Sequence, residues 1–273
     1  MMDIRIVDTT LRDGEQRSGI ALCPSEKVQI VKMLDCLGIY QIEVGIPAMG
    51  GDEKKSIQKI MELDTKSRIS TWSRMNINDI KESIECNPHL IHISIPSSDI
   101  QISHKLGKDR GYVLDNMRKC IAYAKDKGFE VTVGLEDASR ADLDFLLELI
   151  KDAYSQGIKR IRYADTVGIL YRKRIYEDVL KIRSHIKELD LEIHAHNDLG
   201  MAVSNSIAAV RGGACYVDCT IGGIGERAGN CDFLKFISSA KAVLGLCREY
   251  NIKDIVKTQK GILKIISNVA AVS

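Results

Sequence analysis

The chain alternates short apolar segments with longer segments of helical periodicity, and this alternation repeats eight times. The short segments are rich in Ile and Val, which is the composition of buried strands. Strands that alternate with single helices predict βαβ units and a parallel sheet. Eight such units in 273 residues favour a closed barrel over an open, doubly wound sheet. The predicted fold class is therefore α/β, a (β/α)8 TIM barrel with a short C-terminal helical tail.

The boundaries of these segments can be read from the same pattern. The predicted strands cover residues 4–10, 41–45, 68–74, 90–96, 129–136, 160–166, 192–198 and 216–221. The predicted helices cover residues 25–37, 51–64, 76–86, 111–127, 141–156, 172–188, 200–212 and 231–247. We expect one catalytic barrel over residues 1–247. Residues 248–273 are predicted to form a helical tail, the start of a C-terminal region that this chain lacks.

The composition excludes several classes of protein. Lysine and arginine number 39 against 37 aspartate and glutamate, and a formal charge of +2 gives no reason to expect nucleic acid or a membrane surface as a partner. The eight cysteines are scattered without a C-x-x-C pair, which indicates reduced thiols rather than a disulfide framework. The sequence shows no signal-peptide pattern and no apolar run long enough to span a bilayer. We therefore predict a cytoplasmic protein.

A His-x-His pair, His194 and His196, lies in the seventh predicted strand. Side chains alternate between the two faces of a strand, so both imidazoles project from the same side, with Asp198 next in line. A lone histidine is more often a hydrogen-bonded core residue. Two imidazoles on one face, however, are natural ligands for a divalent metal, and we interpret the pair in that way.

Polar side chains collect at the C-terminal ends of five predicted strands, which is where the active site of such a barrel lies. These groups are residues 9–16, Glu136 with Asp137, Asp165 with Thr166, the histidine pair, and the glycine-rich loop 222–230. One polar cluster could arise by chance. Five clusters at the same end of one barrel predict an active site.

Asp13 is the carboxylate best suited to complete the metal site, because it follows the first strand and Gly14 lets the loop turn sharply. Two imidazoles and one carboxylate form a metal site with open positions for an oxygen chelate. Arg12 can stabilise negative charge that develops on a substrate oxygen, although a surface ion pair with Asp13 is the alternative. Glu136 should point inward and is a candidate acid or base, or else a structural partner for an inward cation.

Strand alternation also points His92, Ser94 and Arg162 into the barrel. An interior with these groups would suit anionic, oxygen-rich ligands, although a buried ion-pair network explains Arg162 equally well. In the loop after the eighth strand, Gly223 and Gly225 permit close approach of a ligand to the backbone. Such a loop is as often only a turn.

Three motifs in this order resemble the Claisen-condensing, metal-dependent TIM-barrel family. They are residues 8–16 (DTTLRDGEQ), 194–200 (HAHNDLG) and 225–230 (GERAGN). This family includes isopropylmalate, citramalate and homocitrate synthases, with hydroxymethylglutaryl-CoA lyase as a barrel-only relative. Residues 47–50, 93–99, 104–107 and 136–142 are most similar to the nitrogen-fixation type of homocitrate synthase.

The resemblance implies an acyltransferase that condenses acetyl-CoA with a 2-oxo acid. With 2-oxoglutarate as the 2-oxo acid, the products are homocitrate and CoA. It implies metal ligation by Asp13, His194 and His196, with Asn230 in or near the ligand set. It assigns Arg12 to the alkoxide and Glu136 to the proton transfer that makes the enolate. Gln16, Ser94 and Thr166 would contact the substrate, and Gly223 and Gly225 would lie on the CoA side. The metal could be Mg²⁺, Mn²⁺, Zn²⁺, Fe²⁺ or Co²⁺.

Two departures from the family pattern raise further expectations. Lysine-pathway homocitrate synthases carry an arginine where this chain has Thr132, so another group must hold the distal carboxylate of 2-oxoglutarate, and Arg74 is our hypothesis. The full-length synthases also continue into a C-terminal region that contributes residues to a neighbouring subunit's site. We therefore expect a homodimer, a separate subunit that supplies this region, or both.

Several alternatives remain open from the sequence. The substrate could instead be that of an isopropylmalate or citramalate synthase. The chain could be a barrel-only acyl-CoA lyase or aldolase, part of a longer chain, or a barrel subunit that is inactive without its C-terminal partner.

Overall fold

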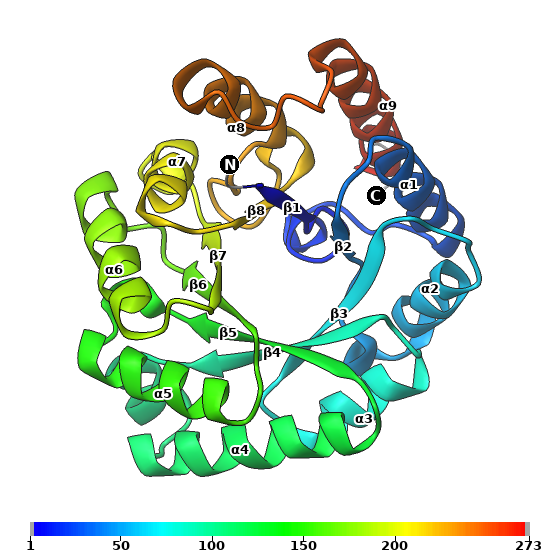
Figure 1. Cartoon of the computed structure of the whole chain (residues 1–273). Helices are drawn as coiled ribbons and strands as arrows, with labels where there is room; N and C mark the ends of the chain where they lie inside the picture. Colours follow the sequence, from blue (N-terminus) through cyan, green and yellow to red (C-terminus); the bar gives the residue numbers. More distant parts are fainter. Residues whose placement is uncertain (1–2, 271–273) are drawn as a thin grey trace.

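The computed structural model describes residues 3–270, which form a closed barrel of eight parallel strands in sequential order, surrounded by helices (Figure 1). The strands are β1 (Arg5–Asp8), β2 (Gln41–Glu43), β3 (Arg68–Arg74), β4 (Leu90–Pro96), β5 (Glu130–Glu136), β6 (Arg160–Asp165), β7 (Asp190–Ala195) and β8 (Tyr216–Cys219). The helices are α1 (Pro24–Cys36), α2 (Gly51–Met61), α3 (Ile77–Glu85), α4 (Arg110–Asp126), α5 (Leu143–Ser155), α6 (Arg172–His185), α7 (Ala202–Gly212), α8 (Phe233–Ser239) and α9 (Ile252–Ala270). The predicted TIM barrel is confirmed.

Several predicted boundaries differ from the structure by one to three residues, and two elements matter for the site. The seventh strand begins two residues and ends three residues earlier than predicted, at Ala195, so His196 is held beyond it by a single bridge to Asn230. The eighth helix was predicted over 231–247, but α8 begins after the N-cap Asp232 and gives way to a π turn at Ala240–Leu244.

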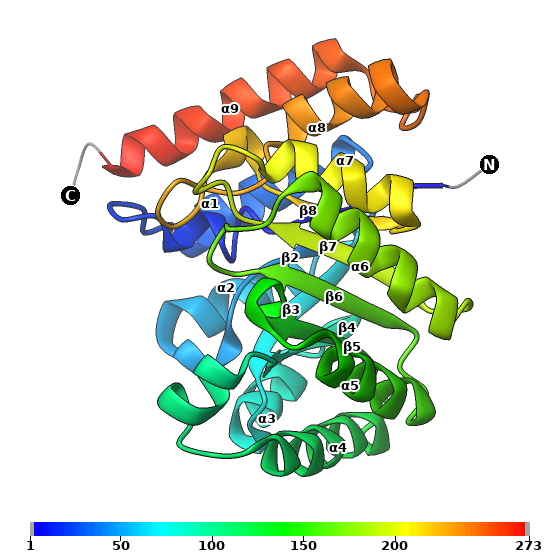
Figure 2. The same cartoon turned by 90° about the vertical axis from the view of Figure 1, so that its left-hand side faces the viewer.

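The predicted helical tail corresponds to α9, and residues 271–273 of that prediction lie outside the described part. α9 runs along one side of the barrel next to α8 and also contacts α1 (Figure 2). Its buried residues include Ile255 and Ile262, both fully shielded from solvent. The spacing of seven residues places these two side chains on one face of the helix, so apolar burial docks the tail on the barrel.

Alternation along each strand separates an apolar outer layer from a polar interior. In β6, Ile161 and Tyr163 pack outward among the buried hydrophobic residues, whereas Arg162 points inward, where it contacts Glu43 of β2 and Glu192 of β7. Most barrels of this type fill their interior with branched apolar side chains. Here the interior is a network of charged and hydrogen-bonded groups directly below the catalytic end.

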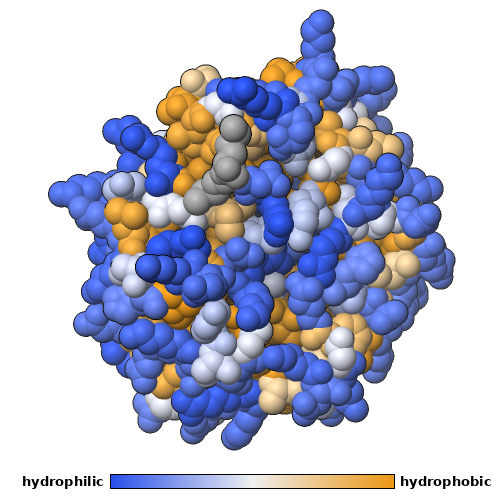
Figure 3. Space-filling view, in the orientation of Figure 1, coloured by the Kyte–Doolittle hydropathy of each residue, from blue (hydrophilic) through white to orange (hydrophobic). Residues whose placement is uncertain are grey.

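The face shown in Figure 3 is mostly hydrophilic, with hydrophobic patches scattered among charged side chains. Scattered apolar residues are normal on a protein surface. Among the helices of residues 3–270, none has both the length and the apolar character needed to cross a membrane.

Candidate metal centre and catalytic cavity

Each of the five polar groups predicted at the strand ends contributes to the wall of one cavity of about 250 Å³ at the C-terminal mouth of the barrel, although Asp137 and Asp165 do not line it. Its wall is built by residues from the loop after β1, from β3 to β7 and their ends, and from the loop after β8. The lining residues are Arg12, Asp13, Gln16, Trp72, His92, Ser94, Gly134, Glu136, Arg162, Ala164, Thr166, His194, His196 and Glu226.

Asp13, His194 and His196 converge at one side of this cavity. Nε2 of His194 lies 3.1 Å from Oδ2 of Asp13 and 3.1 Å from Nε2 of His196, and Nε2 of His196 lies 3.5 Å from the same Oδ2. All three residues are buried. Three ligand atoms, each about 2.1 Å from a shared ion and separated by angles of 90–110°, would lie about 3.0–3.4 Å apart. The observed separations therefore fit a divalent metal.

Unpartnered buried atoms support this fit. Oδ2 of Asp13 and Oδ1 of Asn230 are both shielded from solvent and accept no hydrogen bond from any residue of 3–270. Such groups are rare in native interiors unless water or an ion satisfies them. Asn230 also bridges to His196 through its backbone, and its side-chain amide donates to the Ile224 carbonyl at 3.1 Å, which fixes its orientation. The amide oxygen is thus available as a further ligand.

The glycine-rich loop shapes the position of Asn230. A side chain at Gly225 would place its Cβ 2.1 Å from Nδ2 of Asn230, so only glycine fits there. Gly223 adopts a positive φ of 66° and its carbonyl accepts a hydrogen bond from the Asn230 backbone at 3.0 Å. In the described structure both glycines pack behind Asn230 rather than on the cavity wall. Their predicted place beside CoA stays a prediction.

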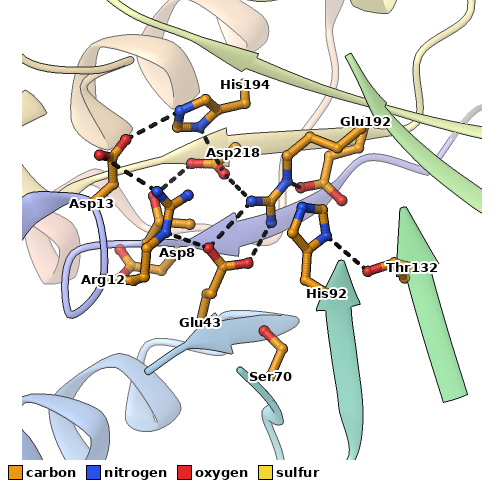
Figure 4. A network of polar contacts seen from close by, with 12 residues as sticks. Asp8, Arg12, Asp13, Glu43, Ser70, His92, Thr132, Glu192, His194 and Asp218 are labelled. Atoms are coloured by element: carbon orange, nitrogen blue, oxygen red, sulfur yellow. Dashed lines mark hydrogen bonds and ion pairs between the residues drawn. The ribbon is translucent and has the colours of Figure 1, made fainter. Parts of the chain in front are cut away.

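His194 is oriented by a second carboxylate, Asp218 of β8 (Figure 4). Nδ1 of His194 lies 2.9 Å from Oδ2 of Asp218, whose other oxygen accepts a hydrogen bond from the Thr9 hydroxyl at 2.7 Å. A carboxylate on the far nitrogen holds the ring in the tautomer that leaves Nε2 free for a metal and increases its basicity.

The charges around the centre shift the pKa values of its ligands. Burial disfavours a charged His194, but the carboxylates of Asp218 and Asp13 outweigh it and raise the pKa of His194 to about 9. Burial and the neighbouring His194 together lower the pKa of His196 to about 4. Asp13 is buried, yet Arg12 and His194 hold the pKa of its carboxyl well below the ordinary range. Asp13 is therefore an anion that attracts a cation into the site.

Arg12 is held rigidly at the edge of the cavity. Its Nε lies 2.6 Å from Oε1 of Glu43, and its guanidinium lies 3.5 Å from Asp13. Glu43 also accepts two hydrogen bonds from Arg162, at 3.2 and 2.7 Å. Although burial opposes ionisation of Glu43, Arg162 and Arg12 keep the pKa of its carboxyl below its usual value. Arg12 therefore presents a fixed positive charge beside the metal ligands.

Glu136 lies on the opposite wall, at the end of β5. Its Oε1 accepts hydrogen bonds from Nε2 of Gln101 and from Nζ of Lys105, both at 3.0 Å, and its Oε2 lies 3.5 Å from the Ser94 hydroxyl. The carboxyl group is partly exposed and faces the cavity. It is placed to exchange a proton with a ligand there.

These geometric features agree with comparison to known protein families. The sequence profile of the HMGL-like family matches residues 3–262, nearly the whole chain. The chain belongs to the HMGL-like family.

Several HMGL-like relatives are synthases. Homocitrate synthase subunit alpha from Clostridium pasteurianum is 53% identical over 266 residues, which cover 97% of this chain and 98% of that protein. The 2-isopropylmalate synthase 2 of Caldanaerobacter subterraneus is 46% identical over 88% of this chain, and homocitrate synthase 1 of Nostoc is 42% identical over 90%. The chain spans 62% and 65% of the length of these last two relatives. The predicted resemblance to homocitrate synthase and the prediction of an acyltransferase are confirmed.

Solved structures agree on the fold alone. The HMG-CoA lyase of Brucella melitensis superimposes with a TM-score of 0.85, covering 98% of this chain and 100% of that one, at 15% sequence identity.

The structure brings most predicted site residues of this HMGL-like chain together. Gln16, Ser94 and Thr166 all line the cavity, as Arg12 and Glu136 do. The Thr166 hydroxyl also accepts a hydrogen bond from the Asp137 backbone at 2.8 Å. The roles of these residues toward a substrate stay predictions.

Arg74 is the exception. Its side chain is 67% exposed and lies away from the cavity wall, and its Nε is 2.6 Å from Oδ2 of Asp79. Asp79 sits in the first turn of α3, where a carboxylate is favoured by the helix dipole, and it also accepts a hydrogen bond from the Arg74 backbone. The predicted placement of Arg74 beside the substrate is therefore wrong in this structure.

Three site residues were missed by the sequence reasoning: Glu43, Trp72 and Asp218. Each lies on an inward position of a predicted strand, so alternation applied to every strand would have found them. Glu43 and Asp218 carried a further signal, because a carboxylate in the middle of a buried strand needs a partner.

Proposed function

We propose that this chain is the catalytic barrel of a homocitrate synthase-type acyltransferase, which condenses acetyl-CoA with 2-oxoglutarate to give homocitrate and CoA. The observation that carries the proposal is the convergence of Asp13, His194 and His196 beside the fixed guanidinium of Arg12. The names of the clostridial and Nostoc relatives support the substrate. In the reaction, a methyl proton of acetyl-CoA leaves, the resulting carbanion attacks the keto carbon, and water later releases CoA from the thioester.

The ligand atoms of Asp13, His194 and His196, with Oδ1 of Asn230, would hold a divalent cation. Mg²⁺, Mn²⁺, Zn²⁺, Fe²⁺ and Co²⁺ all fit this set of nitrogen and oxygen donors. When bound, such an ion supplies Lewis acidity to an oxygen of the 2-oxo acid.

The chain's own residues supply the other parts of the chemistry. Arg12 offers a permanent positive charge to the oxygen that becomes an alkoxide, and its ion pair with Glu43 keeps it in place before the reaction. Glu136 is partly exposed in the cavity and takes part in moving the proton from the acetyl methyl group. Gln16 and Thr166 orient carboxylate oxygens of the 2-oxo acid by hydrogen bonding.

The distal carboxylate of 2-oxoglutarate needs partners other than Arg74. We assign it to the wall formed by β3, β4 and β5, which lies across the barrel from the candidate metal ligands at the C-terminal ends of β1 and β7. Trp72, His92 and Ser94 supply polar groups on that wall. Burial, with the positive charge of Arg162, lowers the pKa of His92 well below its ordinary value, so His92 acts as a neutral hydrogen-bonding group. Gly134 leaves room for the His92 ring, because a Cβ at position 134 would lie 2.4 Å from Nε2 of His92.

A panel of 2-oxo acids tests the substrate. Purified chain, loaded with Mn²⁺ or Mg²⁺, is mixed with acetyl-CoA and each acid, and released CoA is measured with a thiol reagent. We expect release with 2-oxoglutarate above that with pyruvate or 2-oxoisovalerate, and a selective rise in the Michaelis constant for 2-oxoglutarate in His92→Ala. Release with 2-oxoisovalerate instead would favour an isopropylmalate synthase, in line with the Caldanaerobacter relative. Cleavage of a 3-hydroxyacyl-CoA to acetyl-CoA and a carbonyl product, with no thiol released, would favour a lyase.

The name of the clostridial relative, subunit alpha, supports a second component. We propose that residues 1–247 form the barrel, that the tail from residue 248 docks on it, and that a separate subunit in the cytoplasm supplies a C-terminal region, with the barrel forming a homodimer. The assay above is therefore run with the chain alone and with its co-purified partner. Full activity of the chain alone, as a monomer, would contradict this part of the proposal.

A further inference from the structure

Lys27, in the first turn of α1, is a buried ion outside the cavity. Its side chain is 1% exposed, and lysine is almost never fully buried unless it is paired. Its ammonium group contacts two carboxylates, Oε2 of Glu15 at 2.5 Å and Oε2 of Glu53. Each of the three charges would be costly to bury alone, so the three groups depend on one another.

The second oxygen of each carboxylate is bonded to the backbone at the catalytic end of the barrel. Oε1 of Glu15 accepts a hydrogen bond from the Leu22 backbone, and Oε1 of Glu53 accepts one from the Ile46 backbone, both at 2.9 Å. Gly45, with a φ of 147°, makes room for this arrangement, because a Cβ there would lie 2.0 Å from Oε1 of Glu53. Lys27 therefore ties the loop after β1 to the loop after β2.

The loop after β1 is the one that carries the metal ligand. Glu15 lies in the 3-10 turn Gly14–Gln16, directly after Asp13. From inside the barrel, Glu43 of β2 holds Arg12 of the same loop at 2.6 Å. The segment that presents Arg12 and Asp13 is thus held to β2 from inside by Glu43 and to the loop after β2 from outside by Lys27.

We infer that Lys27 is a positioning residue for the metal centre, acting through Glu15 and Glu53 to fix Asp13 relative to the histidine ligands. This inference rests on the metal site of the proposed function. Without the ammonium, the two partly buried carboxylates repel each other, and the turn that follows Asp13 loses its outer anchor.

Lys27→Met tests this role, since methionine keeps most of the length and removes the charge. Lys54→Met is a matched control, because Lys54 also pairs with two carboxylates, Glu82 and Glu85, but between the outer helices α2 and α3. The readout is the dissociation constant of Mn²⁺ for EDTA-treated protein by calorimetry, at a temperature where circular dichroism shows each variant folded. We expect at least a tenfold increase for Lys27→Met and less than a twofold change for Lys54→Met.

A purely structural role would lower the melting temperature of Lys27→Met and leave the Mn²⁺ affinity of the folded protein unchanged, and that result would overturn the inference. If Lys27→Met does not fold, Glu15→Gln serves instead, because its amide oxygen can still accept from Leu22 while its charge is gone. An affinity loss of threefold or more then supports the inference, and a smaller change overturns it. If wild-type protein binds no Mn²⁺, the metal centre of the proposed function is refuted, and this result is distinct from a failure of the Lys27 inference.

Discussion

The carboxylate of Asp218 should set the metal affinity of the site although it is not among the expected ligands. It lies 2.9 Å from Nδ1 of His194, and burial leaves no solvent to replace it. Asp218→Asn keeps the shape of the side chain and a partner for the Thr9 hydroxyl. The variant loses the negative charge that makes Nε2 of His194 a strong ligand.

The size of the effect follows from what the substitution removes. Loss of such a carboxylate partner typically weakens metal binding by about 10- to 100-fold, which corresponds to about 1.4–2.7 kcal/mol. The amide oxygen can still accept a hydrogen bond from the imidazole, so the lower half of this range is expected for asparagine. Asp218→Ala removes the acceptor as well and should reach the upper half.

The assay is calorimetric titration of metal-free protein with Mn²⁺, accompanied by the visible absorption of bound Co²⁺, which reports the ligand geometry. Asp8→Asn is the matched control. Asp8 is an equally buried aspartate, on the neighbouring strand β1, but its carboxylate accepts from the Thr10 backbone and hydroxyl, both at 3.0 Å. The reasoning is refuted if folded Asp218→Asn binds Mn²⁺ within twofold of wild type.

Three further outcomes are expected. His196→Ala should abolish measurable Mn²⁺ binding in a folded protein, because it removes one of three converging ligands; retained tight binding would exclude the site. Burial raises the pKa of Asp8 to about 7, so folded protein keeps a proton that the unfolded chain releases near pH 4, and wild-type stability falls as the pH rises between these values. Asp8→Asn cannot ionise and should gain roughly 2 kcal/mol relative to wild type between pH 5 and 8 in urea denaturation, whereas a constant difference would contradict the assignment. Ile262→Ala in α9 should cost about 2–5 kcal/mol of unfolding free energy without changing Mn²⁺ affinity, and a parallel loss of affinity would show that α9 shapes the site.

The fold and the convergence of the candidate metal ligands could be predicted because both depend on periodicity. Eight repeats of strand and helix favour a closed barrel, and closure brings the strand ends together, so Asp13 and the histidine pair meet although His194 lies 181 positions after Asp13. Periodicity does not predict which nearby group a charged side chain at the end of a strand will pair with. The alternation of β3 points Arg74 inward after Trp72, but Asp79 in the next helix accepts hydrogen bonds from its guanidinium at 2.6 and 3.0 Å and holds the side chain outside the cavity.

The charges inside the barrel explain why the missed residues matter for the site. Four carboxylates, those of Asp13, Glu43, Glu192 and Asp218, face the three guanidiniums of Arg12, Arg160 and Arg162. Ion pairs neutralise most of this charge, and one negative charge is left over at the end where His194 stands. In the absence of a metal, a proton on His194 compensates for it, which is why the carboxylates of Asp218 and Asp13 raise the pKa of that imidazole to about 9. A cation at the centre can take the place of that proton, so the buried network favours positive charge at this one position and leaves Arg12 free for its proposed role toward the substrate oxygen.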